Sequence, residues 1–252
     1  PQARLELIAQ YEPSIVQVEG DYGALYADGV ALSASHPISI LVSDAPARIS
    51  GYKTVVFEIY ESLAPNTPDA IALPASSGGF ASGVWRGLRD LAALDLLDEL
   101  PRLYLVQTAS ADPITRAFDS GATEPTALSP EETEETIAHS IGNPDPPSGA
   151  RALAAVRETN GAVVSVTDAE IRTAQRRFAV DGGFCVEPAA ATPLAGLARL
   201  SERGAIASDE EVVIVPTGTG FKERGTGDAS VSTERTSRSA LPELLESLLD
   251  AR

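Results

Sequence analysis

A run of small residues at positions 74–80, Pro-Ala-Ser-Ser-Gly-Gly-Phe, joins an apolar segment typical of a buried strand to a segment with the apolar period of a helix. Such a turn directs free backbone N–H groups and the positive end of a helix dipole at one point, where a phosphate binds well. Its glycine spacing matches neither the Walker loop nor the dinucleotide fingerprint. Gly and Ser are also common in ordinary turns between a strand and a helix, so two interpretations stay open. The candidate anion ligands are Ser76, Ser77, Gly78 and Gly79.

A second turn of small residues, Pro-Thr-Gly-Thr-Gly-Phe at positions 216–221, follows the last apolar run of the chain. In a doubly wound sheet, ligands bind at the carboxyl ends of the strands, so this turn and the first are expected to face one pocket. The hydroxyls of Thr217 and Thr219 are suitable donors to a ring nitrogen or a phosphate. An ordinary turn is the alternative.

Other catalytic arrangements have little support in the sequence. Cys185 is the one cysteine, and no base stands near it in the sequence to activate its thiol. His36 and His139 are the only histidines, which with one cysteine are too few for a convincing zinc site. The Gly-x-Ser-x-Gly motif of serine hydrolases does not occur. We therefore predict neither a catalytic residue nor a metal ligand in this chain.

The amino-acid composition excludes some classes of binding partner. Acidic residues outnumber basic ones by 36 to 19, and the net charge of −17 argues against binding to nucleic acid or to an anionic membrane. A single cysteine makes the cytoplasm the default compartment. No apolar run approaches the roughly 18 residues that a membrane span needs.

Apolar β-rich runs alternate with amphipathic segments, which is typical of an α/β fold with a parallel sheet flanked by helices. The predicted strands are 14–19, 38–43, 70–74, 103–108, 162–166 and 211–216, and the predicted helices are 52–63, 80–94, 168–180, 188–203 and 241–250. Thr167 and Glu170 form a capping-box pattern at the start of one of these helices. Two polar segments, 121–135 and 223–239, are predicted to be surface loops; the first has a short helix near its end, and the second is mobile.

Six blocks of the sequence, in order, resemble the carboxyl-terminal two thirds of threonine synthase, a pyridoxal-phosphate enzyme of the tryptophan synthase β-like fold type (fold type II). The blocks are GYKTVVFEI (51–59), the segment 73–108, TIAHSIGNP (136–144), VVSVTDAEI (163–171), FCVEPAAATPLAGL (184–197) and VVIVPTGTGFKE (212–223). The resemblance implies a three-layer, doubly wound, mostly parallel sheet whose amino-terminal part is missing. It implies residues 1–45 as a remnant of a smaller amino-terminal domain, and 46–252 as the large cofactor-binding domain.

The family's phosphate loop usually reads Pro-x-Gly-Asn-Gly-Gly-Asn. The resemblance therefore implies that Ser76, Ser77, Gly78, Gly79 and Phe80 hold the phosphate of pyridoxal 5'-phosphate, with the first Gly and both Asn of that pattern replaced. Thr217 matches the residue that hydrogen-bonds the pyridine nitrogen in this family. An uncharged hydroxyl there suits elimination and replacement chemistry.

The family's cofactor-binding lysine lies in an amino-terminal Ser-Phe-Lys-Asp-Arg-like motif, which does not occur here. Lys53 and Lys222, the two lysines of the chain, fall in other blocks. The resemblance thus implies that Pro1 corresponds to a point well inside the family domain. The expected partners are a small phosphorylated amino acid and either a second copy or a complementing chain.

Three functions remain open on the sequence. The first is a threonine synthase-like enzyme, which converts O-phosphohomoserine and water to threonine and phosphate. The second is another fold type II replacement or dehydratase activity. The third is a non-catalytic paralogue that acts as a binding or regulatory module.

Overall fold

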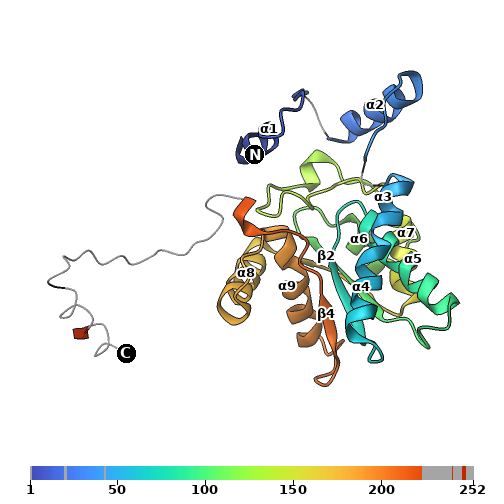
Figure 1. The fold of residues 1–252 in the computed structure, drawn as a ribbon, viewed down its shortest axis with the longest axis vertical. Helices are drawn as coiled ribbons and strands as arrows, with labels where there is room; N and C mark the ends of the chain where they lie inside the picture. The colour runs from blue at the N-terminus through green and yellow to red at the C-terminus, as the bar shows by residue number, and fades with distance from the viewer. Residues whose placement is uncertain (1, 20–21, 43, 223–239, 241–245, 248–252) are drawn as a thin grey trace.

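The computed structural model describes residues 2–19, 22–42, 44–222, 240 and 246–247 (Figure 1). The predicted mobile loop 223–239 lies outside the described residues. So does the predicted last helix, except for residues 246–247.

A four-stranded parallel sheet forms the middle of the molecule (Figure 1). Its strands are β1 (Ala70–Pro74), β2 (Arg102–Thr108), β3 (Ala162–Val166) and β4 (Val212–Ile214). They lie side by side in the order β3-β2-β1-β4, and every neighbouring pair is parallel. Four of the predicted strands are therefore confirmed, and with them the parallel sheet.

The two strands predicted at 14–19 and 38–43 are wrong within the described residues, because those residues have no strand structure. A β-strand needs a neighbouring strand to take its backbone hydrogen bonds. The described part of the chain offers none there, and Val16 is left 81% exposed. An alternating apolar pattern was thus not enough to form a strand.

Helices cover both faces of the sheet, which confirms the three-layer α/β fold. One face carries α4 (Lys53–Leu63), α5 (Gly79–Ala93), α6 (Pro113–Asp119) and α7 (Gly149–Glu158), with α3 (Pro46–Gly51) beside α4. The other face carries α8 (Asp168–Gly182) and α9 (Pro188–Glu202) (Figure 1). The sequence patterns predicted α4, α5, α8 and α9 but missed α3, α6 and α7. The loop at 121–135 holds the short 3₁₀ helix η1 (Pro130–Glu132), which confirms the short helix predicted near its end.

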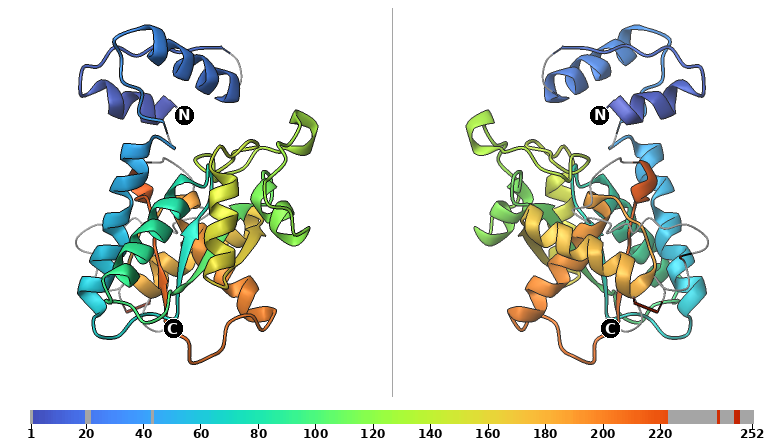
Figure 2. Two further views of the ribbon diagram at one scale, coloured as in Figure 1. Left: turned by 90° about the vertical axis from the view of Figure 1, so that its right-hand side faces the viewer. Right: turned by 90° about the vertical axis from the view of Figure 1, so that its left-hand side faces the viewer.

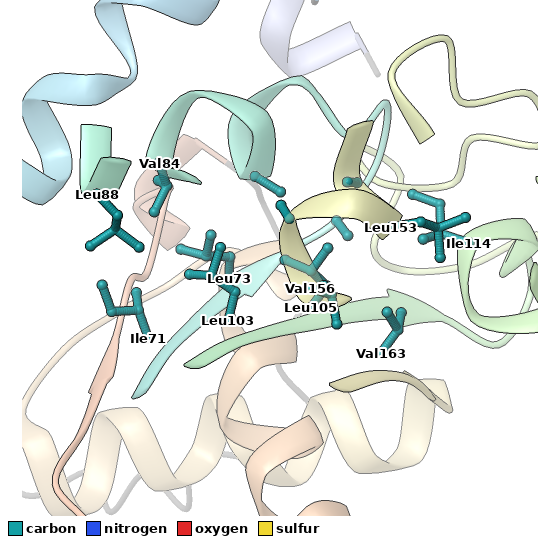
Figure 3. Close-up of a cluster of buried hydrophobic side chains, with 14 of the residues drawn as sticks. Ile71, Leu73, Val84, Leu88, Leu103, Leu105, Ile114, Leu153, Val156 and Val163 are labelled. Carbon is teal, nitrogen blue, oxygen red and sulfur yellow. The ribbon is translucent and has the colours of Figure 1, made fainter. Parts of the chain in front are cut away.

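Strand β1 shows why this sheet is buried on both faces. Ile71 and Leu73 pack under α4, α5 and α7, in the cluster that Figure 3 shows. Ala70 and Ala72 point to the opposite face, under α9, and all four residues are fully buried. The small side chains on that second face let α9 lie close to the sheet. A Cβ on Gly196 of α9 would be 2.3 Å from Val106 Cγ2.

Helices α1 (Gln2–Ala9) and α2 (Tyr22–Ser35) lie outside the three layers, beyond the carboxyl edge of the sheet (Figure 2). This part of the chain carries large apolar side chains that are exposed, including Tyr11 (87%) and Leu41 (77%). Among the helices that the structure describes, none is both long enough and apolar enough to span a lipid bilayer.

Candidate functional site

The turns that follow β1 and β4 lie side by side at the carboxyl edge of the sheet. Ala72 pairs with Ile214, and the N–H of Val215 donates to the carbonyl of Ala72 at 3.1 Å. Strand β4 ends at Ile214, two residues before Pro216, and β1 ends at Pro74. Strands β2 and β3 continue from β1 in one direction, whereas β4 returns on the other side of β1. This is a topological switch point, where open α/β sheets bind their ligands.

The turn after β1 has a backbone that only glycine fits at its centre. Gly78 has φ = +84° and precedes the first residue of α5. A Cβ on Gly78 would also stand 2.6 Å from the carbonyl oxygen of Ser148, at the start of α7. Both the positive φ and the close contact therefore exclude a side chain at this position.

This turn presents hydrogen-bond donors. In the described part of the chain, the backbone N–H groups of Ser76 and Gly78 donate to no protein acceptor. The first N–H groups of α5 have no acceptor within their helix, and the N–H of Gly79 has only the distant Ser77 Oγ, at 3.5 Å. Together with the positive end of the α5 dipole, these groups make the turn able to hold a phosphate.

Phe80 contributes to this site only through its backbone. Its ring packs edge to face on Tyr52, with the ring centroids 5.1 Å apart and the planes at 70°. The ring also contacts the core cluster beneath α4 and α5. The Asn that the family pattern has here is thus replaced by a side chain that serves helix packing.

The turn after β4 is held in place by the segment before α9. Thr217 is exposed, and Gly218 next to it is buried. The N–H of Glu187 donates to the carbonyl of Gly218 at 3.1 Å, and a Cβ on Gly218 would be 2.1 Å from Glu187 Oε1. The N–H of Gly220 donates to the carbonyl of Cys185 at 2.9 Å. These contacts fix the backbone on which the Thr217 hydroxyl is carried.

A polar network fastens a long loop over the carboxyl ends of β2 and β3. The Thr108 hydroxyl at the end of β2 donates to Thr136 Oγ1 at 3.1 Å, and Thr136 in turn donates to Asp168 Oδ1 at 2.6 Å. The other carboxylate oxygen of Asp168 accepts the N–H of Ile137 at 3.1 Å. The same loop carries His139, which is exposed, and then leads to Ser148 and α7.

Neither lysine lies in the two turns that follow β1 and β4. The Nζ of Lys53 forms an ion pair with Asp90, which links α4 to α5. Lys222 is exposed in η2 (Gly220–Lys222), beyond Thr217. In the part of the chain that the structure describes, no three His, Cys, Asp or Glu side chains come together as a metal site.

Sequence reasoning missed Ser148 in this region, and it singled out Glu187 without its partner. Ser148 lies 70 positions after Gly78, and no local pattern links it to the turn after β1. Glu187 had a signal, because it directly precedes Pro188 at the start of a helix, but its contact with Gly218 needs the fold.

Comparison with known proteins agrees with this geometry. Residues 1–218 match the family model described as "Pyridoxal-phosphate dependent enzyme". The chain is 37% identical over 212 residues to a threonine synthase of Methanosarcina acetivorans, a match that covers 84% of this chain and 52% of the relative. It is 35% identical over 213 residues to a threonine synthase of Methanocaldococcus jannaschii, with the same two coverages. The chain thus spans about half the length of these curated relatives.

Solved structures share the fold. A serine racemase from Dictyostelium discoideum superposes with a TM-score of 0.66 at 21% identity, over 92% of this chain and 66% of the racemase. A threonine deaminase isoform from Solanum lycopersicum gives 0.68 at 19% identity, over 98% of this chain and 63% of the deaminase. These similarities confirm the tryptophan synthase β-like, fold type II architecture.

The residues present also fit the family's cofactor. Among the described residues, the turn after β1 has N–H donors without protein acceptors, and its centre admits no side chain. A phosphate group needs such a concave set of donors, and the Thr217 turn lies on the neighbouring strand. By sequence match and by fold, this chain belongs to the pyridoxal-phosphate dependent enzymes.

Proposed function

We propose that this chain forms the cofactor-binding part of a threonine synthase-like enzyme, which converts O-phosphohomoserine and water to threonine and phosphate. The observation that carries the proposal is the meeting of the turns after β1 and β4 at the switch point of the sheet. The threonine synthases that match over 84% of the chain support the choice of reaction. With one cysteine, the chain is suited to the cytoplasm.

Each candidate residue has a distinct task in this proposal. The backbone N–H groups of the turn after β1 and of the first turn of α5 hold the cofactor phosphate; these belong to Ser76, Ser77, Gly78, Gly79 and Phe80. The Thr217 hydroxyl pairs with the pyridine nitrogen. When bound, the cofactor supplies an electron sink for charge that develops on an amino-acid substrate. The exposed Thr217 and the half-buried Ser76 leave this edge of the sheet open to a small phosphorylated amino acid.

We further propose that the lysine that binds the cofactor lies outside these 252 residues, on an upstream segment or on a complementing chain. The ion pair of Lys53 with Asp90, on the α4–α5 side, supports this assignment. Residues 1–45 would then belong to a smaller domain, and 46–252 to the large one. The exposed apolar side chains of Tyr11 and Leu41 fit a segment that packs against more protein. An upstream reading frame without a Ser-x-Lys-Asp-Arg-like motif would count against an upstream segment as the source of this lysine.

The phosphate loop is tested by comparing two ligands that differ only in the phosphate. Pyridoxal 5'-phosphate and pyridoxal are titrated into the purified protein, and binding is followed by fluorescence. We expect the phosphorylated ligand to bind at least about ten-fold more tightly, since charge-assisted hydrogen bonds are the strong ones. Ser76→Asp places a negative charge in the turn and should remove this preference. Ser208→Asp, in the loop before β4 at the other edge of the sheet, is the matched control. Equal affinity of the wild type for both ligands would overturn the proposal.

The reaction is tested in the protein together with its lysine-bearing part. Release of phosphate and formation of threonine from O-phosphohomoserine are expected to depend on Thr217. Thr217→Val should lower kcat while the preference for the phosphorylated cofactor is kept, and Thr219→Val is the control two residues away. Release of ammonia from serine or threonine in place of phosphate release would assign a dehydratase. Cofactor binding without turnover would assign the non-catalytic paralogue, which the replaced loop residues Ser76, Ser77 and Phe80 favour.

A further inference from the structure

The two turns at the carboxyl edge of the sheet share the backbone features that suit an anion. Each follows a strand and contains two glycines. In the described part of the chain, the N–H groups of Thr217 and Gly218 donate to no protein acceptor, as is true of those of Ser76 and Gly78. The Thr217 hydroxyl suits a phosphate as well as a ring nitrogen. Backbone donors alone therefore do not decide at which of the two turns a phosphate binds.

The side chain of Glu187 distinguishes the two turns. It lies along Gly218, because a Cβ on Gly218 would be 2.1 Å from Glu187 Oε1 and 2.4 Å from its Cδ. The carboxylate thus fills the space beside the backbone of the turn after β4. At the turn after β1, the atoms nearest to a Cβ on Gly78 belong to Ser148 and Ala152, which carry no charge. A negative charge is therefore built against one turn and not against the same position of the other.

The position of this carboxylate is set by the fold. Glu187 is 8% exposed, and although it is the N-cap residue of α9, its side chain makes no capping hydrogen bond. Residues 185–187 pair in antiparallel fashion with the turn after β4, through the hydrogen bonds from Glu187 to Gly218 and from Gly220 to Cys185. The positive end of the α9 dipole favours a carboxylate here. Capping of α9 does not account for this buried carboxylate.

We propose that Glu187 determines which turn takes the phosphate. Its carboxylate repels an anion from the turn after β4, so the cofactor phosphate binds only at the turn after β1 and the ring nitrogen is left to Thr217. The inference rests on the proposed function, because it concerns the orientation of the ligand in the same site. Like charges repel each other strongly in a place that water reaches poorly, whereas a neutral ring nitrogen is not repelled. The same repulsion keeps the phosphate of a phosphorylated substrate away from Thr217.

Two probes that each represent one end of the cofactor test this assignment. Inorganic phosphate represents the anion, and pyridoxine has the pyridine ring without a phosphate. Calorimetry gives the number of phosphates bound per chain, and fluorescence gives the Kd of pyridoxine with and without saturating phosphate. The wild type should bind one phosphate. Its Kd for pyridoxine should change by less than about two-fold when phosphate is added, because the two probes occupy separate turns.

Glu187→Gln keeps the size of the side chain and removes its charge. This variant should bind a second phosphate, at the turn after β4, where it competes with the ring. Saturating phosphate should therefore raise the apparent Kd of pyridoxine by at least about five-fold. A merely structural defect would weaken pyridoxine binding equally with and without phosphate. The dependence on phosphate is thus the readout that separates repulsion from damage to the turn.

Two further variants act as controls. Glu202→Gln removes the same charge at the exposed end of α9 and should behave as the wild type does. Glu187→Asp keeps the negative charge on a shorter side chain and should keep phosphate from competing with pyridoxine. Rescue by aspartate would assign the effect to the charge of this residue.

The proposal is overturned if the wild type binds two phosphates, or if phosphate displaces pyridoxine from the wild type. These two results decide the matter even if Glu187→Gln does not fold. It is also overturned if pyridoxine binding to a folded Glu187→Gln variant is as insensitive to phosphate as binding to the wild type. In each case a wild type that prefers pyridoxal 5'-phosphate over pyridoxal leaves the proposed function standing. A wild type without that preference would overturn the proposed function, and the assignment of Glu187 with it.

Discussion

The backbone of Gly87 on α5 packs against the side chain of Val56 on α4: a Cβ on Gly87 would lie 2.4 Å from Val56 Cγ1. Gly83, four residues earlier, has the same relationship to Tyr52, whose Cβ would be 2.5 Å away. The two glycines lie on one face of α5, since residues four apart are neighbours on a helix. This face receives the junction of α3 and α4, and the close packing sets the position of α5 and of the turn that precedes it.

Gly87→Ala should therefore destabilise the protein, although alanine favours helix formation more than glycine does. Overpacking against Val56 should outweigh the gain in helix propensity, for a net loss of about 1–2 kcal/mol in the free energy of unfolding. Urea denaturation of both proteins measures the difference. Gly51→Ala is the control, because Gly51 at the end of α3 has no atom within 4 Å of a Cβ. A Gly87→Ala variant as stable as Gly51→Ala would show that α4 moves aside freely.

Glu170 links the start of α8 to α9, and its titration should contribute to acid unfolding. Burial raises the pKa of the Glu170 carboxyl, but the backbone N–H and hydroxyl of Thr167 and the Arg199 guanidinium outweigh it, so the pKa is lowered overall. A carboxyl whose pKa is lower in the folded state stabilises the fold above its unfolded pKa, and this contribution is lost as the pH falls through the folded value.

Glu170→Gln should accordingly be less stable than the wild type at pH 7. The difference in melting temperature should shrink as the pH falls below 4.5, the ordinary pKa of this carboxyl, and should be lost once the pH is below the lowered pKa of the folded state. Thermal melts from pH 7 to pH 3 test this. Glu202→Gln at the exposed end of α9 controls for the loss of one negative charge. A difference that stays constant across this range would mean that the glutamine disturbs packing and not charge.

Thr136→Val should loosen the loop that covers the carboxyl ends of β2 and β3. Thr136 is buried, and its hydroxyl joins Thr108 to Asp168. Valine keeps the shape but leaves these partners unpaired, at a cost of about 1–3 kcal/mol. Hydrogen exchange should rise in residues 133–148, while the strand β1 stays protected. Thr136→Ser keeps the hydroxyl and should restore most of the protection; a serine variant as open as valine would show that the hydroxyl alone does not hold the loop.

The sequence predicted the strands of the central sheet better than it predicted the structure of the segment before residue 45. The run 70–74 is apolar throughout and the run 103–108 is apolar up to Val106, so their strand character is local. The segment 14–19 has a similar pattern but lacks a neighbour to pair with, and pairing is a property of the whole fold. Helix α7 was missed although its apolar residues follow a helical spacing, with Ala152, Leu153, Ala155 and Val156 on its buried side.

The candidate site was predictable where it is local in sequence. The turn after β1 carries its own signal in Gly78, and the turn after β4 in Gly218. Their meeting could be expected only from the rule that ligands bind at the carboxyl ends of strands. The contacts of Ser148 with Ser77, and of Glu187 with Gly218, join residues far apart in the chain, so no pattern along the sequence reveals them.

The sheet order β3-β2-β1-β4 implies that the turns after β1 and β4 form at different stages of folding. The turn after β1 can form once β1, α5 and α7 have assembled, but Thr217 arrives only with β4, the last strand of the sheet to be synthesised. Contacts between residues so distant in the chain form slowly, because a long loop must close first. Under the proposed function, an intermediate that lacks β4 would already bind the phosphate, and binding of the pyridine ring by Thr217 would come with the final step of folding.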